Sequence, residues 1–102
     1  MIETIEIMIQ NGPKEVLYAL IVYQRNICYL NRKKYTVTNE FLEEVVRTIR
    51  LWKNEYGTSN KIDSEEFRVI VKTKEKEEHF HGKGIFPDNY EHLKEMLGDI
   101  HD

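Results

Sequence analysis

The feature that most constrains the fold is a hairpin-like pair of segments in the second half of the chain, at residues 66–73 and 79–86. The first segment alternates β-branched or aromatic residues with polar ones, and the highly charged residues 74–77 separate it from the second. Alternation of this kind is typical of β-strands. Because an isolated hairpin is only marginally stable in water, we expect it to pack on helices, to gain a third strand from the N-terminus, or to pair with another chain.

Residues 2–10 allow two interpretations. Their apolar residues form a helical stripe at Ile2, Ile5 and Ile9 and a strand-like alternation at Ile5, Ile7 and Ile9. A short helix is favoured, because Gly12 followed by Pro13 is a common way to end one helix and begin another. The strand is the alternative.

The segment from Pro13 to about Leu30 is predicted to be a second helix. Its apolar residues cover a wide helical surface, with Leu17, Leu20, Ile21 and Cys28 on one face and Val16, Tyr23, Ile27 and Leu30 beside it. So wide an apolar surface is typical of a central, buried helix.

Two further helices are predicted. One is capped by Thr38 and runs through an apolar stripe to Gly57, with the stripe formed by Phe41, Val45, Ile49, Trp52 and Tyr56. The last is capped by Asp88, closed by Gly98, and places Tyr90, Leu93, Leu97 and Ile100 on its apolar face. The sequence therefore predicts a small α+β domain with two or three N-terminal helices, an antiparallel hairpin at about 66–73 and 79–86, and a C-terminal helix.

Composition bounds the class of protein. The 102 residues suffice for a single domain, residues 1–102, and the net charge of −3 argues against binding nucleic acid by bulk electrostatics. Cys28 is the only cysteine, which excludes an internal disulfide and fits a reducing cytosol. The N-terminus lacks a signal-peptide pattern, and the longest apolar run, residues 16–23, is too short to span a bilayer. We therefore expect a cytoplasmic protein without membrane contact.

The stretch EEHFHGKGIF, residues 77–86, is the strongest candidate for chemistry. On a strand, His79 and His81 share one face while Phe80 points to the core. Two imidazoles on one face can begin a divalent metal site, with Glu77 or His92 as a third ligand. The simpler interpretation is a pair of exposed histidines with no cofactor. The glycines that follow lack the strand-to-helix context of a phosphate loop.

The His79-Phe80-His81 stretch resembles the histidine-hydrophobic-histidine motif of the HUH endonucleases. The resemblance implies a metal held by the two histidines and a helical tyrosine that attacks a DNA phosphate, and the segment YEHLK would supply Tyr90 and a supporting Lys94. Tyr90 follows the histidines more closely than the family's tyrosine does, and the resemblance covers only this short part of the chain.

Positive charge and tyrosine gather in one segment. Residues 16–39 contain no acidic residue, and the candidate partner-binding residues there are Arg25, Tyr29, Arg32, Lys33, Lys34 and Tyr35. Arginine and tyrosine are enriched in binding surfaces, and cations pair with carboxylates or phosphates. The structural alternative is that the basic residues complement a helix dipole and that half of the tyrosines are core residues.

These observations favour a small non-catalytic binder that regulates or inhibits a larger protein. Chains of this style are frequent in phages and mobile elements, so a host nucleic-acid-processing or defence enzyme is the expected partner, with an anti-CRISPR-type inhibitor as an example. One alternative is a winged-helix-like DNA-binding regulator, with Lys72, Lys74 and Lys76 on phosphates. The other is a metal-dependent nuclease or phosphoesterase that uses His79 and His81. An exposed hairpin edge also makes a homodimer an open alternative.

Overall fold

The computed structural model describes residues 1–12, 15–58 and 64–100. One seven-stranded sheet carries two helices and a short 3₁₀ helix. In chain order the elements are β1 (Ile2–Asn11), β2 (Glu15–Val22), η1 (Tyr23–Arg25), β3 (Ile27–Leu30), β4 (Lys33–Thr36), α1 (Asn39–Arg50), β5 (Glu55–Thr58), β6 (Glu66–Thr73), β7 (Glu77–Lys83) and α2 (Tyr90–Gly98).

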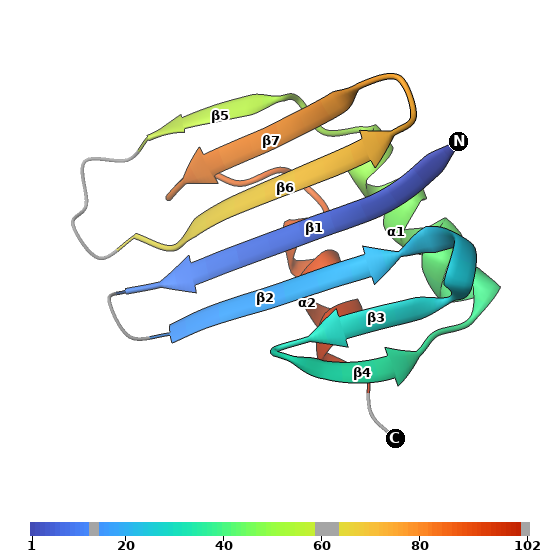
Figure 1. Ribbon diagram of the computed structural model, residues 1–102. Coiled ribbons are helices and arrows are strands. Elements are labelled where there is room, and N and C mark those ends of the chain that lie inside the picture. Colours follow the sequence, from blue (N-terminus) through green and yellow to red (C-terminus); the bar gives the residue numbers. More distant parts are fainter. Residues whose placement is uncertain (13–14, 59–63, 101–102) are drawn as a thin grey trace.

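The sheet is mixed, with the strand order β4-β3-β2-β1-β6-β7-β5. The N-terminal strand β1 lies in the middle and pairs antiparallel with β2 on one side and β6 on the other. The only parallel pair in the described chain is β5 with β7. Figure 1 shows both helices behind the sheet and no element in front of it, so the domain has one covered face and one open face.

The first two predicted helices, at residues 2–10 and from Pro13 to about Leu30, are wrong. Residues 2–10 belong to β1, as in the alternative interpretation, and residues 15–30 form β2, η1 and β3 rather than a helix. Alternate residues of β1 are buried against the helices, at Ile5, Ile7 and Ile9. The domain is therefore mostly β-structure.

The strand β2 explains the error in the second segment. Its covered face carries Leu17, Ala19 and Ile21, of which the last two are fully buried. Its open face carries the apolar residues Val16, Tyr18, Leu20 and Val22. A strand that is apolar on both faces has no period-two signal, and a continuous apolar run matches a buried helix equally well.

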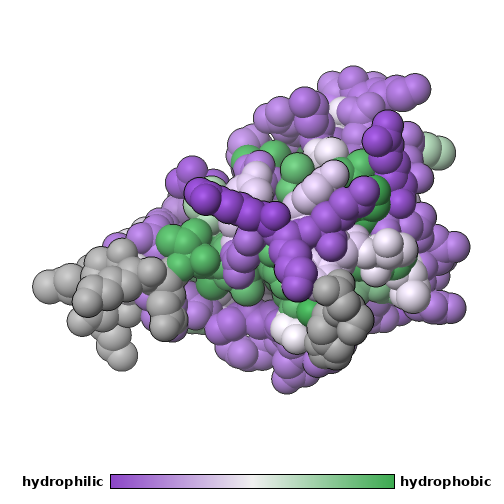
Figure 2. All heavy atoms as spheres, turned by 60° about the horizontal axis from the view of Figure 1, so that its bottom comes forward, coloured by the Kyte–Doolittle hydropathy of each residue, from purple (hydrophilic) through white to green (hydrophobic). Residues whose placement is uncertain are grey.

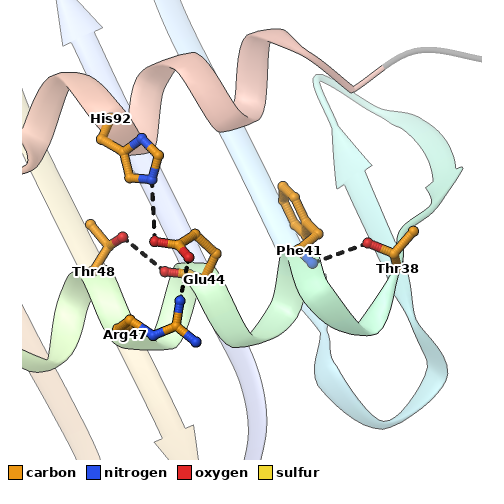
Figure 3. A network of polar contacts seen from close by, with 6 residues as sticks. All are labelled: Thr38, Phe41, Glu44, Arg47, Thr48 and His92. Carbon is orange, nitrogen blue, oxygen red and sulfur yellow. Dashed lines mark hydrogen bonds and ion pairs between the residues drawn. The ribbon is translucent and has the colours of Figure 1, made fainter.

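The helix α1 is confirmed, although it ends earlier than predicted. The hydroxyl of Thr38 accepts a hydrogen bond of 3.0 Å from the backbone N–H of Phe41, as a helix cap does (Figure 3). The helix ends at Arg50, and Trp52 lies beyond it. Trp52 and Tyr56 still pack against Phe67 of β6, with ring centroids 5.6 and 6.1 Å away, so they continued the apolar spacing without continuing the helix.

The hairpin is confirmed as β6 and β7, with Val69 opposite Phe80. Its second strand ends at Lys83 rather than at residue 86. It gains both of the intramolecular partners that were expected, since β1 adds to β6 and the helices cover Phe67, Val69 and Phe80. A seven-stranded sheet with one packed face removes the marginal stability of an isolated hairpin.

The final helix α2 is also confirmed, but Asp88 does not cap it. Its N-cap residue is Asn89, which makes no side-chain capping bond. Polar contacts to the start of β6 anchor the helix: the hydroxyl of Tyr90 donates to the Glu65 carboxylate, and Lys94 Nζ lies 3.1 Å from both Glu65 oxygens. No helix in the described parts of the chain is long and apolar enough to cross a membrane.

Candidate functional site

The open face of the sheet carries a group of apolar side chains on neighbouring strands that we call the apolar strip. It consists of Met8, Val16, Tyr18, Leu20, Val22, Ile27, Tyr29 and Ile70. The strands hold these side chains together, since Met8 lies opposite Tyr18 and Leu20 lies opposite Tyr29. Val16 and Tyr29 retain 52% and 37% of their surface exposed. This surface was not predicted from the sequence, and its signal was the apolar run of residues 16–23, seven of which lie in β2.

One acidic residue lies within the apolar strip and is paired. Glu6 stands opposite both Leu20 and Ile70, and its carboxylate accepts a hydrogen bond of 2.6 Å from the Tyr18 hydroxyl. This hydrogen bond raises the pKa of Tyr18, with a smaller contribution from burial. The strip therefore presents Glu6 as a hydrogen-bonded group rather than as a lone charge.

The hairpin of β3 and β4 brings most of the predicted partner-binding residues together. Tyr29 and Lys34 face each other on the open side, while Lys33 and Tyr35 lie on the other side, with the Lys33 ammonium 5.6 Å from the Tyr35 ring centroid. Arg32 occupies the turn at one end of the hairpin. Arg25 lies apart from it in η1, beyond the opposite end of β3.

This arrangement overturns the helix-dipole explanation of the basic residues. Residues 27–36 form two strands, so there is no α-helix C-terminus for Arg32, Lys33 or Lys34 to complement. Arg32, Lys33 and Lys34 lie on the β3–β4 hairpin, which forms one edge of the described sheet, and residues 16–39 contain no acidic residue. Figure 2 brings the β4 edge of Figure 1 forward and shows mostly hydrophilic residues there, with hydrophobic ones between them.

The turn between β3 and β4 is strained and held in place. Asn31 and Arg32 have positive φ values of 49° and 74°, as a type I′ hairpin turn requires at both central residues. Asparagine tolerates this region, but for arginine it costs about 1–2 kcal/mol. Asn31 fixes the turn to β2, because its backbone N–H donates to the carbonyl oxygen of Tyr18 at 2.8 Å and its side-chain oxygen accepts from the Tyr18 N–H at 2.9 Å.

A shallow hollow of about 520 Å³ lies where the turn meets the apolar strip. It is lined by Val16 and Tyr18 from β2 and by Asn31 and Arg32 from the turn. The hollow thus combines an exposed apolar side chain, a tyrosine and a guanidinium, which suits a partner group with both apolar and acidic parts.

His79 and His81 lie on the open face of β7, as the alternation predicted, while Phe80 is buried on the other face. Each histidine has one carboxylate nearby: His79 Nε2 is 3.4 Å from Glu77, and His81 Nε2 is 3.6 Å from Glu66. The described residues contain no group of three or more histidine, cysteine or carboxylate side chains placed to hold a metal ion. The histidine pair therefore gains no third ligand from these residues.

The other suggested partners of the histidines lie behind the sheet. His92 is on α2, where its Nε2 is 3.3 Å from the Glu44 carboxylate of α1 (Figure 3). Tyr90 is only 2% exposed, stacks on Phe86 and belongs to the core. Burial is the main cause that raises the Tyr90 pKa, and the hydrogen bond to Glu65 adds to it. The sheet thus separates Tyr90 and Lys94 from the histidines, and the site that the HUH resemblance implies is not assembled.

A winged-helix arrangement needs several helices before the hairpin. In the described chain α1 is the only α-helix there, and the two earlier segments predicted as helices form β1, β2, η1 and β3. The helix α1 packs its apolar side on the sheet through Leu42, Val45 and Ile49.

No known protein family, curated protein or solved structure matches this chain.

Proposed function

We propose that this protein is a non-catalytic binding module that regulates or inhibits a larger protein, with the apolar strip at the centre of the contact. The observation that carries the proposal is that β2 is apolar on both faces while the helices cover only one. Strands with two apolar faces are ordinarily buried on both. A partner protein on the open face would bury the second one.

The composition of the surface supports a protein partner. Tyrosine, methionine and branched apolar residues form the strip, and Arg32 and Lys34 lie at its margin. Contacts between proteins commonly have an apolar and aromatic centre with a polar rim. The strain at Arg32 supports the same proposal. An arginine held at positive φ lowers the stability of the fold, and the turn does not itself require an arginine there. The prediction that the partner is a host nucleic-acid-processing or defence enzyme stays a prediction.

A pair of matched variants tests the proposal. Leu20→Lys places a charge in the apolar strip, and His79→Lys places the same charge in the same row of the open face, three strands away. We expect the wild-type protein and the His79→Lys variant to capture the same partner protein from a cell lysate, and the Leu20→Lys variant to lose it. Circular dichroism checks that both variants fold.

Two outcomes would contradict the proposal. Equal capture by both variants would show that the strip is not the contact surface. Tight, salt-sensitive binding of duplex DNA in a gel-shift assay at moderate salt would instead favour a nucleic-acid-binding regulator, because neutralising phosphates makes affinity strongly dependent on salt.

A further inference from the structure

The edge strand β4 leaves backbone hydrogen-bonding groups without a neighbouring strand. In the described sheet β4 is the outermost strand on its side. Val37, directly after β4, donates its N–H to the Asn26 carbonyl oxygen at 2.8 Å. Because backbone groups alternate in direction along a strand, the odd-numbered residues of β4 turn their N–H and C=O groups toward β3. Lys34 and Thr36 therefore turn their N–H and C=O groups outward, away from the sheet.

The side chains around this edge are basic on both faces. An added strand would lie beside Lys34 on the open face, with Tyr29 behind it, and beside Lys33 and Tyr35 on the other face. Arg32 stands at the turn. Residues 16–39 themselves contain no acidic residue.

A second copy of β4 fits this edge poorly. Pairing two such edges would bring lysines of both copies close together, and like charges on adjacent strands are destabilising. Lysine on an edge strand is a common protection against self-association for this reason. The charge pattern selects an acidic strand.

We propose that an extended, acidic segment of the partner protein adds to β4 as a further strand of the sheet. Its backbone pairs with Lys34 and Thr36, and its carboxylates pair with the Arg32 and Lys34 side chains. Main-chain hydrogen bonds supply affinity in this mode of recognition, and alternate side chains supply specificity. The inference rests on the proposed function and adds the chemistry of the partner segment.

Synthetic peptides test this inference without knowledge of the partner. The probe is a short peptide of alternating Glu and Val residues with blocked ends, and its control is the same peptide with every second backbone amide methylated. The controls are made in both registers, so that one of them always blocks the edge facing β4. We expect the unmodified peptide to bind and to slow amide hydrogen exchange at Lys34 and Thr36, and one methylated register to lose both effects, because it keeps its charges but cannot form the ladder.

Three substitutions locate the site. Lys34→Glu should weaken peptide binding by about tenfold or more, while Lys53→Glu, which makes the same change of net charge at an exposed position between α1 and β5, should leave it unchanged. Thr36→Pro removes an outward N–H and should also prevent peptide binding. The variant should still fold, because proline is tolerated on edge strands. Arg32→Gly relieves the strained turn, so it should fold at least as stably as the wild type and still bind more weakly.

Each contrary result overturns the inference. Equal binding of the unmodified peptide and both methylated peptides would mean charge attraction without strand addition, and equal binding of single-stranded DNA would mean a general polyanion site. Growth of a dimer with protein concentration in light scattering, lost in Lys34→Glu, would mean that a second copy occupies the edge. If the peptide fails to bind while Leu20→Lys still abolishes capture of the partner, the proposed function stands and only this inference falls.

Discussion

The two faces of the sheet are formed by the same strands but differ in how far their side chains are buried. On the covered face Ile5, Ile7 and Ile21 are at most 1% exposed, and the helices complete the core. On the open face the neighbouring residues are also apolar along β2, yet Val16 remains half exposed. The two faces of β2 therefore share an apolar composition but differ in burial: one face stabilises the fold, and the other leaves apolar surface exposed, where we propose that a partner binds.

The largest expected effect separates the two faces at adjacent residues of β2. Ile21→Ala removes a fully buried side chain and should lower the free energy of unfolding by about 2–5 kcal/mol. Leu20→Ala removes a half-buried side chain from the open face and should cost less than about 1.5 kcal/mol. Urea denaturation of both variants measures the difference. A larger loss for Leu20→Ala would mean that the open face is part of the folding core.

A second prediction uses the next strand. Cys28 is fully buried, and burial raises the pKa of its thiol from 9.0 to about 11. At pH 8 this lowers the thiolate population about a hundredfold, since each pKa unit is a factor of ten. A thiol reagent at pH 8 should therefore modify Cys28 at least about a hundredfold more slowly in the folded protein than in the unfolded chain. Unfolding the protein in urea should restore the faster rate.

The matched variant places a thiol on the other face. Tyr29→Cys in a Cys28→Ala background puts the thiol at an exposed position of the open face, and we expect it to react at nearly the rate of an unfolded chain. Similar slow rates at both positions would mean that the open face is occluded.

A third prediction concerns close packing on the covered face. A Cβ atom at Gly82 would lie 2.6 Å from Phe67 Cε1 and 2.7 Å from the Ile85 carbonyl oxygen. Gly82→Ala should therefore destabilise the protein by about 1–3 kcal/mol in thermal or urea unfolding. Gly98→Ala is the control, because nothing lies within 4 Å of its added Cβ and alanine favours a helix. Equal stability of the two variants would show that the contact at Gly82 relaxes without cost.

The parts of the fold that the sequence predicted are those with one buried face. The stripe of α1 and the alternation of β7 each carry a single apolar side, and β6 departs from one apolar side only at Ile70, so their period is visible. The strand β2 hides its period because both faces are apolar. The pairing of β1 with β6 joins residues far apart in the chain, and no local spacing specifies it.

The candidate site was predicted in composition but not in shape. The absence of acids in residues 16–39 located the basic and tyrosine-rich segment, and the hairpin of β3 and β4 now carries most of it. A helix over this segment would bury Leu20 in the core, and it does not show that Tyr29 and Lys34 face each other. A strand that is apolar on both faces was the missing hypothesis, and the run from Val16 to Tyr23 was its signal.

The smallest expected effect lies on β7, where the two faces alternate residue by residue. Replacing His79 and His81 together by alanine should change the free energy of unfolding by no more than about 0.5 kcal/mol, because both side chains are substantially exposed. Phe80→Ala, between them but buried in the core, should cost about 3–5 kcal/mol.

Adding zinc during thermal unfolding tests whether the two histidines bind a metal. A rise in Tm for the wild type that the double variant loses would establish a metal site on the open face, since an ion that binds only the folded state stabilises it. The pairing of each histidine with a single carboxylate leads us to expect no such difference.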